Sequence, residues 1–221
     1  MFYICKYLVW LWFHIAYSLK FEGRKNIPKK TQVIYASNHR SYADPPLVCT
    51  GSRGRCSFMA KEELFEKKLF AWLIRSLGAF PVARGKGDST VIDTAVDRLN
   101  NKQSLIIFPE GTRSKDGKVQ RGHTGAALIA ARSGKPIIPV GVVYGEKLKF
   151  RTKLRVIYGE PIMPEEYCEI SDTPNPRQLV RLKNRYMADI KRLVEGEPEP
   201  SQEKKVSEAA SIEAKEESVV E

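Results

Sequence analysis

Six short runs of apolar, β-prone residues recur along the chain, and they constrain its fold more than any other feature. Continuous apolar runs of this kind are typical of strands that are buried on both faces of a sheet. Segments with helical spacing lie between most of the runs, and such an alternation predicts an α/β fold. We therefore expect a single domain with a largely parallel or mixed central sheet flanked by helices. The runs are residues 32–36, 55–60, 79–82, 104–108, 136–144 and 153–158.

The segments between the runs carry the spacing and the end signals of helices. Phe65, Leu69, Leu73 and Leu77 recur at every fourth position, so they share one face of a helix over about residues 62–77. Three more helices are predicted by their caps. They are residues 88–99 capped by Asp88 or Ser89, residues 125–133 ended by Gly134, and a last helix that starts at Pro176 with Asn175 as its cap.

The first residues, MFYICKYLVWLWFHIAYSL, form an aromatic, apolar segment whose only charge is Lys6. As a helix it would be about 28 Å long, close to the roughly 30 Å of a hydrocarbon core. It lacks the basic start and the small-residue cleavage site of a signal peptide. Its aromatic residues suit the headgroup interface, and the cations of residues 20–30 would place the rest of the chain at the cytoplasmic face of the cell membrane. We predict a membrane-associating helix over residues 1–20, which could span the bilayer, lie in one leaflet or be buried in the domain.

Charge divides the chain into two parts. Residues 195–221 carry nine Glu and three Lys and cannot form a core, so we expect an acidic, disordered tail. The first 194 residues carry 34 basic and 17 acidic side chains, a net charge of +17. A surface this basic favours an anionic partner, which leaves nucleic acid, anionic lipid headgroups and phosphorylated small molecules open.

The cysteines and histidines do not predict a metal centre. The four cysteines form no CxxC pair, and the three histidines do not join them at zinc-site spacing. We therefore expect reduced, buried thiols and no metal or other cofactor.

A histidine and an aspartate follow the first run, in the segment SNHRSYADPP. Ligands of parallel α/β sheets lie at the carboxyl ends of strands, so this loop is a candidate site. Asp44 precedes Pro45 and suits an N-cap of the next helix. If the loop folds back, Asp44 could instead hold one nitrogen of His39 and leave the other to accept a hydroxyl proton. The spacing alone does not choose between a general base and a helix cap beside a surface histidine.

Three further strand ends carry residues that could bind an anion. Glu110 and Arg113 follow the fourth run in the segment PEGTRS, where Gly111 permits a tight turn. Arg84 follows the third run and Lys61 the second. A guanidinium at such a position is a good bidentate ligand for phosphate. Each of these segments alone could equally be an ordinary polar loop.

Together, four ordered blocks resemble the glycerolipid acyltransferase family, and within it the bacterial 1-acyl-glycerol-3-phosphate acyltransferases. The resemblance covers about residues 23–158, most of the predicted domain. One block could match by chance, but four in order and at suitable spacing are a specific signal. The blocks are Asn38-His39-x4-Asp44, Gly78-Ala79-Phe80-Pro81-Val82-x-Arg84, Phe108-Pro109-Glu110-Gly111-Thr112-Arg113-Ser114 and Ile138-Pro139-Val140.

The resemblance implies that residues 21–194 are an acyltransferase domain. Such an enzyme moves a fatty acyl group from a thioester of coenzyme A or acyl carrier protein to the sn-2 hydroxyl of lysophosphatidic acid, giving phosphatidic acid. His39 would be the general base, and Asp44 would fix its tautomer. Its partners would be these two substrates, the membrane surface and, for one of the donors, acyl carrier protein, with no cofactor and no nucleic acid. The implied substrate-binding residues are Asn38, Lys61, Arg84, Glu110, Gly111, Thr112 and Arg113.

Two alternatives stay open on the sequence. The same chemistry could act on glycerol-3-phosphate or on another lysolipid. A different class of protein, with no enzymatic activity, could use the basic surface to bind anionic membranes or nucleic acid. The basic residues are dispersed and no aromatic-basic RNA motif is present, which disfavours nucleic acid. An esterase is disfavoured because the chain has no GxSxG motif.

Overall fold

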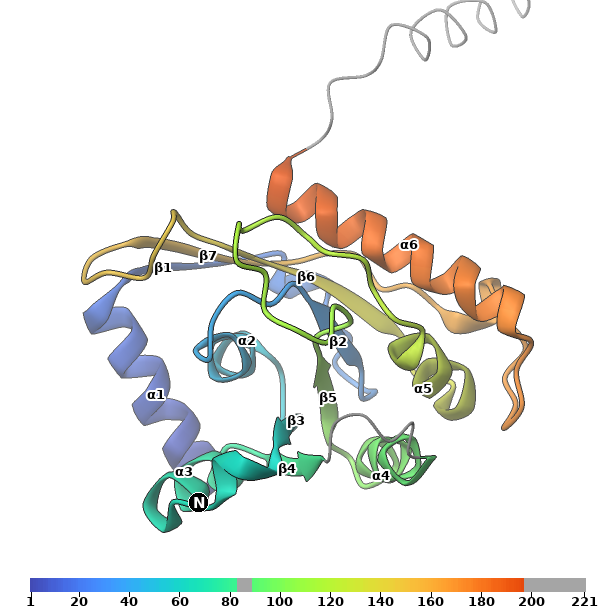
Figure 1. The fold of residues 1–221 in the computed structure, drawn as a ribbon, viewed down its shortest axis with the longest axis horizontal. Helices are drawn as coiled ribbons and strands as arrows, with labels where there is room; N and C mark the ends of the chain where they lie inside the picture. Colours follow the sequence, from blue (N-terminus) through green and yellow to red (C-terminus); the bar gives the residue numbers. More distant parts are fainter. Residues whose placement is uncertain (83–88, 197–221) are drawn as a thin grey trace, which may run out of the picture.

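A seven-stranded sheet forms the centre of the molecule, with helices on both of its faces (Figure 1). The computed structural model describes residues 1–82 and 89–196, so nearly all of the predicted acidic tail lies outside the described residues. The strand order is β1-β7-β6-β2-β5-β3-β4. The strands are β1 (Ser18–Glu22), β2 (Ile34–Ser37), β3 (Cys56–Lys61), β4 (Ala79–Val82), β5 (Ser104–Ile107), β6 (Ile137–Val143) and β7 (Lys153–Tyr158).

All neighbouring strands run parallel except β6 and β7, which are antiparallel. The turn from β6 to β7 brings the chain back beside β6 and gives β1 a parallel partner at the edge, where Ser18 lies opposite Lys153. Each of the six predicted runs forms a strand, with ends within about two residues of those expected. The predicted α/β class with a largely parallel, mixed sheet is therefore confirmed.

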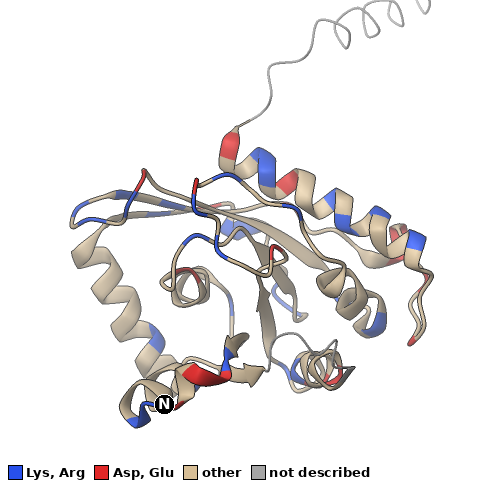
Figure 2. Cartoon of the chain, in the orientation of Figure 1, with Lys and Arg blue, Asp and Glu red and all other residues tan. Residues whose placement is uncertain are grey.

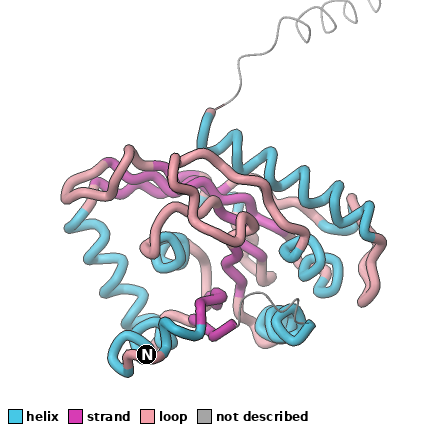
Figure 3. Tube along the Cα trace, in the orientation of Figure 1, coloured by secondary structure: helices cyan, strands magenta, loops and turns pink. Residues whose placement is uncertain are grey.

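The helices divide the core into two clusters, one on each face of the sheet (Figure 3). Side chains of α1, α2 and α3 belong to one cluster, and those of α4, α5 and α6 to the other. The alternation of β2 shows why its run is apolar throughout, because Tyr35 enters the first cluster whereas Ile34 and Ala36 enter the second. The helices are α1 (Phe2–Ala16), α2 (Asp44–Gly51), α3 (Lys68–Ser76), α4 (Ser89–Asn100), α5 (Gly125–Ser133) and α6 (Pro176–Glu195).

The signals for the ends of α5 and α6 are confirmed. Gly134 ends α5 with a left-handed φ of 63°, a conformation that favours glycine. The Asn175 side chain accepts a hydrogen bond from the backbone N–H of Arg177 at 2.9 Å, and Pro176 is the first residue of α6.

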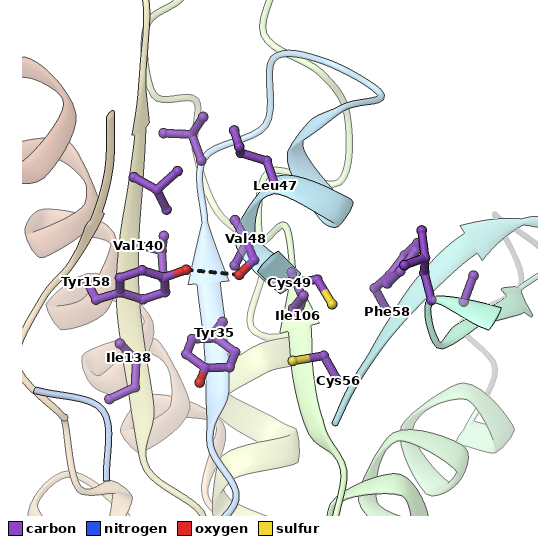
Figure 4. Packing of buried hydrophobic residues seen from close by; sticks show 14 of the residues in the cluster. Tyr35, Leu47, Val48, Cys49, Cys56, Phe58, Ile106, Ile138, Val140 and Tyr158 are labelled. Atoms are coloured by element: carbon purple, nitrogen blue, oxygen red, sulfur yellow. Dashed lines mark hydrogen bonds between the residues drawn. The ribbon is translucent and has the colours of Figure 1, made fainter. Parts of the chain in front are cut away.

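Two buried tyrosines fix α2 against the sheet (Figure 4). The hydroxyl of Tyr158 donates to the backbone oxygen of Val48 at 2.9 Å, and that of Tyr35 accepts from the backbone N–H of Arg53 at 3.3 Å. Both polar ends are thus paired inside the core, and burial raises the pKa of both phenols. All four cysteines are buried and unpaired, as expected. This packing gives the loop that enters α2 a rigid support.

The N-terminal segment belongs to the fold of the domain. Strand β1, which the sequence pattern did not predict, spans the expected boundary at residue 20. Lys6 of α1 donates to the backbone oxygens of Ser52 at 2.9 Å and Gly54 at 3.2 Å, and to the hydroxyl of Ser52. Within residues 1–82 and 89–196, we find no helix with the length and apolar character needed to cross a membrane.

Only one side of α1 is buried, through Phe2, Cys5 and Phe13. The opposite side, which we call the outer face of α1, presents large apolar side chains to the surroundings. A surface helix normally has a polar outer side, so this face is unusual. Its exposed residues are Tyr3, Ile4, Tyr7, Leu8, Leu11, Trp12 and Ile15.

The helix predicted over residues 62–77 is broken in two. Glu62–Phe65 form a 3-10 turn, and the α-helix begins only at Lys68. The break changes the rotational phase, so Ala71 and Ile74 are buried whereas Leu69 is 82% exposed. The inference that Leu69 shares an apolar face with Phe65 therefore fails, because it assumed an unbroken helix.

Candidate active site

His39 and Asp44 form a hydrogen-bonded pair in the loop between β2 and α2. The Nδ1 atom of His39 lies 2.9 Å from Oδ2 of Asp44. The imidazole is mostly buried, with 12% of its side chain exposed, and the carboxylate is fully buried. An Nδ1–H that donates to a carboxylate leaves Nε2 as the ring atom that accepts a proton. The loop therefore folds back as the catalytic interpretation of the sequence requires.

The Asp44 carboxylate also organises the loop itself. Its Oδ2 accepts hydrogen bonds from the backbone N–H groups of Arg40 at 2.6 Å and Ser41 at 2.7 Å. Asp44 is the first residue of α2, and its side chain makes no capping bond at that helix. The expected N-cap is therefore wrong, because the carboxylate turns back towards His39. Three donors converging on one buried oxygen fix the position from which it orients the imidazole.

A second loop, between β5 and α5, holds the main chain of His39. The backbone N–H of His39 donates to Oε1 of Glu110 at 2.9 Å, and its carbonyl accepts from the N–H of Ser114 at 2.8 Å. The other oxygen of Glu110 accepts from the N–H of Gln120 at 2.9 Å. Glu110 is thus a brace between the two loops, and both of its oxygens are used by the main chain. Burial raises the pKa of this carboxyl, although its two N–H donors oppose the shift.

Phe108 supports the imidazole from one side. The rings of Phe108 and His39 are stacked, with centroids 4.1 Å apart and an interplanar angle of 26°. Stacking of this kind restricts rotation of the His39 side chain. The ring is therefore fixed by a carboxylate at its edge and by an aromatic ring on its face.

Asn38 and Arg40 attach the His39 loop to β6 and to the residues that follow it. The Asn38 amide donates to the carbonyl of Val142 at 3.0 Å and accepts from the N–H of Val142 at 2.7 Å. Arg40 donates to the carbonyls of Tyr144 at 2.7 Å and Gly145 at 2.9 Å. Asn38 is buried with its amide engaged by the main chain, so it attaches the loop to β6, and its contact with substrate stays a prediction.

Arg113 lies at the exposed side of the site, where Tyr42 orients it. One terminal nitrogen of Arg113 donates to the Tyr42 hydroxyl at 3.1 Å, and its guanidinium carbon lies 3.8 Å from the centre of the Tyr42 ring. Thr112 is exposed beside it, and Gly111 has a φ of 70° that favours glycine. The N–H of Gly111 donates to the carbonyl of Phe108, so it is already engaged. This arrangement presents a positive charge next to the His39 loop.

Two predicted residues remain, Lys61 and Arg84. Lys61 is exposed at the carboxyl end of β3, on the same edge of the sheet as the His39 loop. Arg84 lies outside the described residues.

Among residues 1–82 and 89–196, no cluster of three or more His, Cys, Asp and Glu side chains is arranged to hold a metal ion.

Sequence reasoning missed four residues that hold the site together: Phe108, Tyr42, Arg40 and Gln120. Phe108 and Tyr42 lie inside the motif segments, but the sequence analysis gave neither residue a role. Arg40 and Gln120 act on or through the main chain, and no residue pattern predicts such contacts. The signal that could have found Tyr42 was an aromatic residue three positions after His39 in the same segment.

Comparison with known proteins gives one consistent result. The family model described as Acyltransferase matches residues 18–143. A 1-acyl-sn-glycerol-3-phosphate acyltransferase of Bacillus subtilis is 28% identical over 180 residues, which cover 79% of this chain and 87% of that protein. A chloroplastic 1-acyl-sn-glycerol-3-phosphate acyltransferase of Arabidopsis thaliana is 32% identical over 138 residues, or 59% of this chain. The chain spans only 38% of the length of that plant relative.

A solved structure agrees with the sequence matches. The 1-acyl-sn-glycerophosphate acyltransferase of Thermotoga maritima superposes with a TM-score of 0.71 at 28% identity, over 88% of this chain and 78% of that one. The matched sequence extends from β1 to the end of β6 and includes the His39–Asp44 pair and the Glu110 brace. Since the family model covers more than half of the chain, this protein belongs to the Acyltransferase family.

Proposed function

We propose that this acyltransferase moves a fatty acyl group from a thioester of coenzyme A or acyl carrier protein to the sn-2 hydroxyl of 1-acyl-glycerol-3-phosphate, giving phosphatidic acid. The names of the bacterial and plant relatives support this acceptor. The site supports it as well, because the cation of Arg113 lies beside the His39 loop and could bind a phosphate monoester.

The reaction begins at Nε2 of His39. This atom takes the proton of the sn-2 hydroxyl as the hydroxyl oxygen attacks the carbonyl carbon of the thioester. Asp44 keeps the proton of Nδ1 in place and offsets the positive charge of the imidazolium. The stacked Phe108 ring and the braced main chain hold Nε2 in one position, which lowers the cost of bringing the two reactants together.

Collapse of the tetrahedral intermediate completes the transfer. The carbonyl re-forms, the bond between carbon and sulfur breaks with its electron pair on sulfur, and the imidazolium returns its proton to the thiolate. Backbone N–H groups near Gly111 or the ammonium of Lys61 could stabilise the oxyanion. Because the Gly111 N–H is engaged, the amides of Thr112 and Arg113 are the better candidates there.

The remaining predicted residues bind the acceptor. Arg113, with Lys61 and Arg84, would hold its phosphate, and Thr112 would add a hydroxyl. The enzyme would draw its lipid acceptor at the cytoplasmic face of the membrane, next to α1.

The fixed His39–Asp44 pair is the observation that carries this proposal. An acyl-transfer assay in detergent tests it, with lysophosphatidic acid as acceptor and with acyl-CoA and acyl carrier protein thioesters as donors. Wild-type protein should release thiol and form phosphatidic acid, and His39→Ala should lower kcat by about a thousandfold or more. Equal melting temperatures would exclude unfolding as the cause.

His14→Ala is the matched control, because His14 lies on α1 and takes no part in the proposed proton transfer. Its activity in detergent should equal that of the wild type. A His39→Ala protein that keeps most of its activity would overturn the general base. Transfer to glycerol-3-phosphate or another lysolipid, but not to lysophosphatidic acid, would overturn the proposed acceptor.

A further inference from the structure

An open cleft lies between the loop that joins β5 to α5 and the C-terminal half of α6. Its volume is about 270 Å³. Pockets for whole small ligands begin at roughly 300 Å³, so a cleft of this size suits one end of a larger ligand. Figure 1 shows the loop running beside α6. We call the space between residues 119–122 of the loop and residues 183–191 of α6 the α6 cleft.

The two walls of the α6 cleft are held together by the fold. The hydroxyl of Tyr186 on α6 donates to the carbonyl of His123 at the end of the loop, at 2.9 Å. Gly122 lies directly against Met187, because a Cβ atom added to Gly122 would be 2.5 Å from the Met187 sulfur. The loop therefore needs glycine at this point to approach α6, and the cleft is already formed in the protein.

Three cations line the α6 cleft: Arg121, Lys183 and Lys191. Lys191 lies 3.8 Å from the carboxylate of Glu195, one turn further along the helix. Within residues 1–82 and 89–196, Arg121 and Lys183 form no ion pair. Cations that gather in a cleft with a single acid beside them create a positive potential there, which favours an anionic ligand.

The other cations of this half of α6 are compensated within the helix. Asp189 lies 3.2 Å from Arg185 and 3.0 Å from Arg192. The charge that stays free, that of Lys183, is therefore on the side that faces the cleft. Figure 2 shows Lys and Arg, in blue, on the loop and on α6 where the two segments run side by side.

The uncharged part of the lining suits a flat heterocyclic base. Val119 on the loop and Met187 on α6 are half-buried and give each wall an apolar surface. The Asn184 amide can both donate and accept a hydrogen bond. A guanidinium such as that of Arg121 binds phosphate through paired N–H groups and also stacks on planar rings. A base that carries phosphates would use both parts of this lining.

The α6 cleft lies close to the His39 loop. The backbone N–H of Gln120, in the wall of the cleft, donates to one oxygen of Glu110, and the other oxygen accepts from the N–H of His39. Only two hydrogen bonds of 2.9 Å and one carboxylate separate the two nitrogen atoms, so they are at most about 8 Å apart. The pantetheine arm of coenzyme A is longer than this when extended. A nucleotide in the cleft can therefore present its thioester at His39.

We infer that the α6 cleft binds the phosphorylated adenosine end of an acyl-coenzyme A donor, with Arg121 and Lys183 as ligands of its phosphates. This inference deepens the proposed function, because it rests on the use of a thioester donor and chooses between the two donors. An acyl carrier protein has no adenosine group and would need a much wider contact surface than this cleft. Arg113, which is proposed to bind the acceptor phosphate, is not part of the lining.

Binding of adenosine 3′,5′-bisphosphate to the full chain tests the site without catalysis. Calorimetry gives its Kd for the wild type and for Arg121→Gln/Lys183→Gln. The variant should bind at least about tenfold more weakly, because two charge-assisted contacts are lost. Since neither side chain forms an ion pair among the described residues, the melting temperature should not change.

Lys29→Gln/Lys30→Gln is the matched control. It removes two exposed cations just before β2, at the edge of the sheet opposite to the His39 loop. The net charge changes as in the cleft variant, so a general effect of charge would appear in both. The control should bind the bisphosphate like the wild type.

Donors with and without the nucleotide separate the α6 cleft from the rest of the active site. For the wild type, KM should be at least about tenfold higher for acyl-pantetheine than for acyl-CoA with the same acyl chain. Arg121→Gln/Lys183→Gln should raise KM for acyl-CoA at least about tenfold. Its kcat and its KM for acyl-pantetheine and for lysophosphatidic acid should stay as in the wild type, because the reacting atoms lie at the other end of the donor.

Four outcomes would overturn the inference. They are an equal Kd for the bisphosphate in wild type and variant, an unchanged KM for acyl-CoA, an equal rise in KM for acyl-CoA and acyl-pantetheine, and a KM that rises only for the acyl carrier protein thioester. The last result would give the cleft to the carrier protein. A wild type that binds the bisphosphate through Arg121 and Lys183 but transfers no acyl group would refute only the proposed function.

Discussion

The loops around His39 bury polar groups in a hydrogen-bonded network, whereas the outer face of α1 exposes apolar side chains. In the loops, the Asp44 carboxylate and both oxygens of Glu110 are bound to neighbouring atoms, and most of this network is hidden from solvent. Along α1 and α3, large apolar side chains are exposed. The first arrangement holds the His39 imidazole in one orientation, and the second leaves large apolar side chains exposed. The comparison teaches that the buried polar network and the exposed apolar surface lie on separate elements, with α2 packed between the His39 loop and α1.

Substitution of Asp44 is expected to have the largest effect on the loops around His39. In Asp44→Asn the oxygen can still accept from the N–H groups of Arg40 and Ser41, but the negative charge that stabilises the imidazolium is lost. We expect kcat to fall by about a thousandfold. Stopped assays in detergent, beside melting curves, measure this effect.

Asp93→Asn is the control for that experiment, because Asp93 is an exposed carboxylate that pairs with Arg132 away from the loop. It should change neither kcat nor KM. If Asp44→Asn kept a tenth or more of the wild-type kcat, the role of the Asp44 charge in stabilising the imidazolium would be refuted.

Glu110→Gln tests whether Glu110 braces the two loops or binds substrate. Glutamine keeps one acceptor oxygen but turns an NH₂ group towards the second backbone N–H, so one partly buried donor loses its partner. We expect a loss of about 1–3 kcal/mol in unfolding free energy and a fall in kcat, with KM for the acceptor unchanged. Urea unfolding and steady-state kinetics measure the two parts. A rise in KM at constant stability would show that Glu110 binds substrate.

Tyr42 and Arg113 test how the exposed cation is oriented. Arg113→Ala should raise KM for the phosphate-bearing acceptor roughly tenfold, because a charge-assisted contact is lost. Tyr42→Ala should raise it less, and Tyr42→Phe least, since phenylalanine retains the stacking and loses only the hydroxyl. The series is measured at varied acceptor in mixed micelles. Equal KM values for the wild type and all three variants would refute the role of Arg113 in binding the acceptor.

The smallest effect is expected where β1 meets β7. Arg155 donates to both oxygens of Glu22 at 2.8 and 2.9 Å and lowers the pKa of that carboxyl to about 2. The folded pKa lies below the unfolded value of 4.5, so the pair stabilises the protein above that value, and this contribution is lost as the pH falls towards 2. Because both side chains are partly exposed, Glu22→Gln should cost only about 0.5 kcal/mol at neutral pH. Thermal unfolding at several pH values should show the difference disappear in acid.

The sequence predicted the interior of the sheet better than its edge. Six apolar runs gave six strands, since burial on both faces leaves little choice of residue type. Strand β1 was missed because SLKFE is a short, half-exposed edge strand inside a segment with a helical composition. The break before α3 was missed because spacing by fours continues across residues 66–67.

The candidate site was predicted by residue type but not by contact. The closeness of His39 and Asp44 follows from a loop that folds back, which the spacing permitted but did not require. The brace at Glu110 and the amide pair of Asn38 with Val142 depend on backbone atoms of residues far away in the chain. Side chains bound to the main chain leave no pattern in a single sequence, so these contacts could not be predicted from it.

The position of β1 has a consequence for the order in which this chain can fold. Its partner in the sheet is β7, and Ser18 pairs with Lys153. A ribosome that adds about 5–20 residues per second needs on the order of ten seconds to make the intervening segment. During that time α1 and β1 have been synthesised, but the sheet edge that receives them does not yet exist. The sheet is therefore completed only by a contact between distant parts of the chain, and α1 and β1 lack part of their final packing until that contact forms.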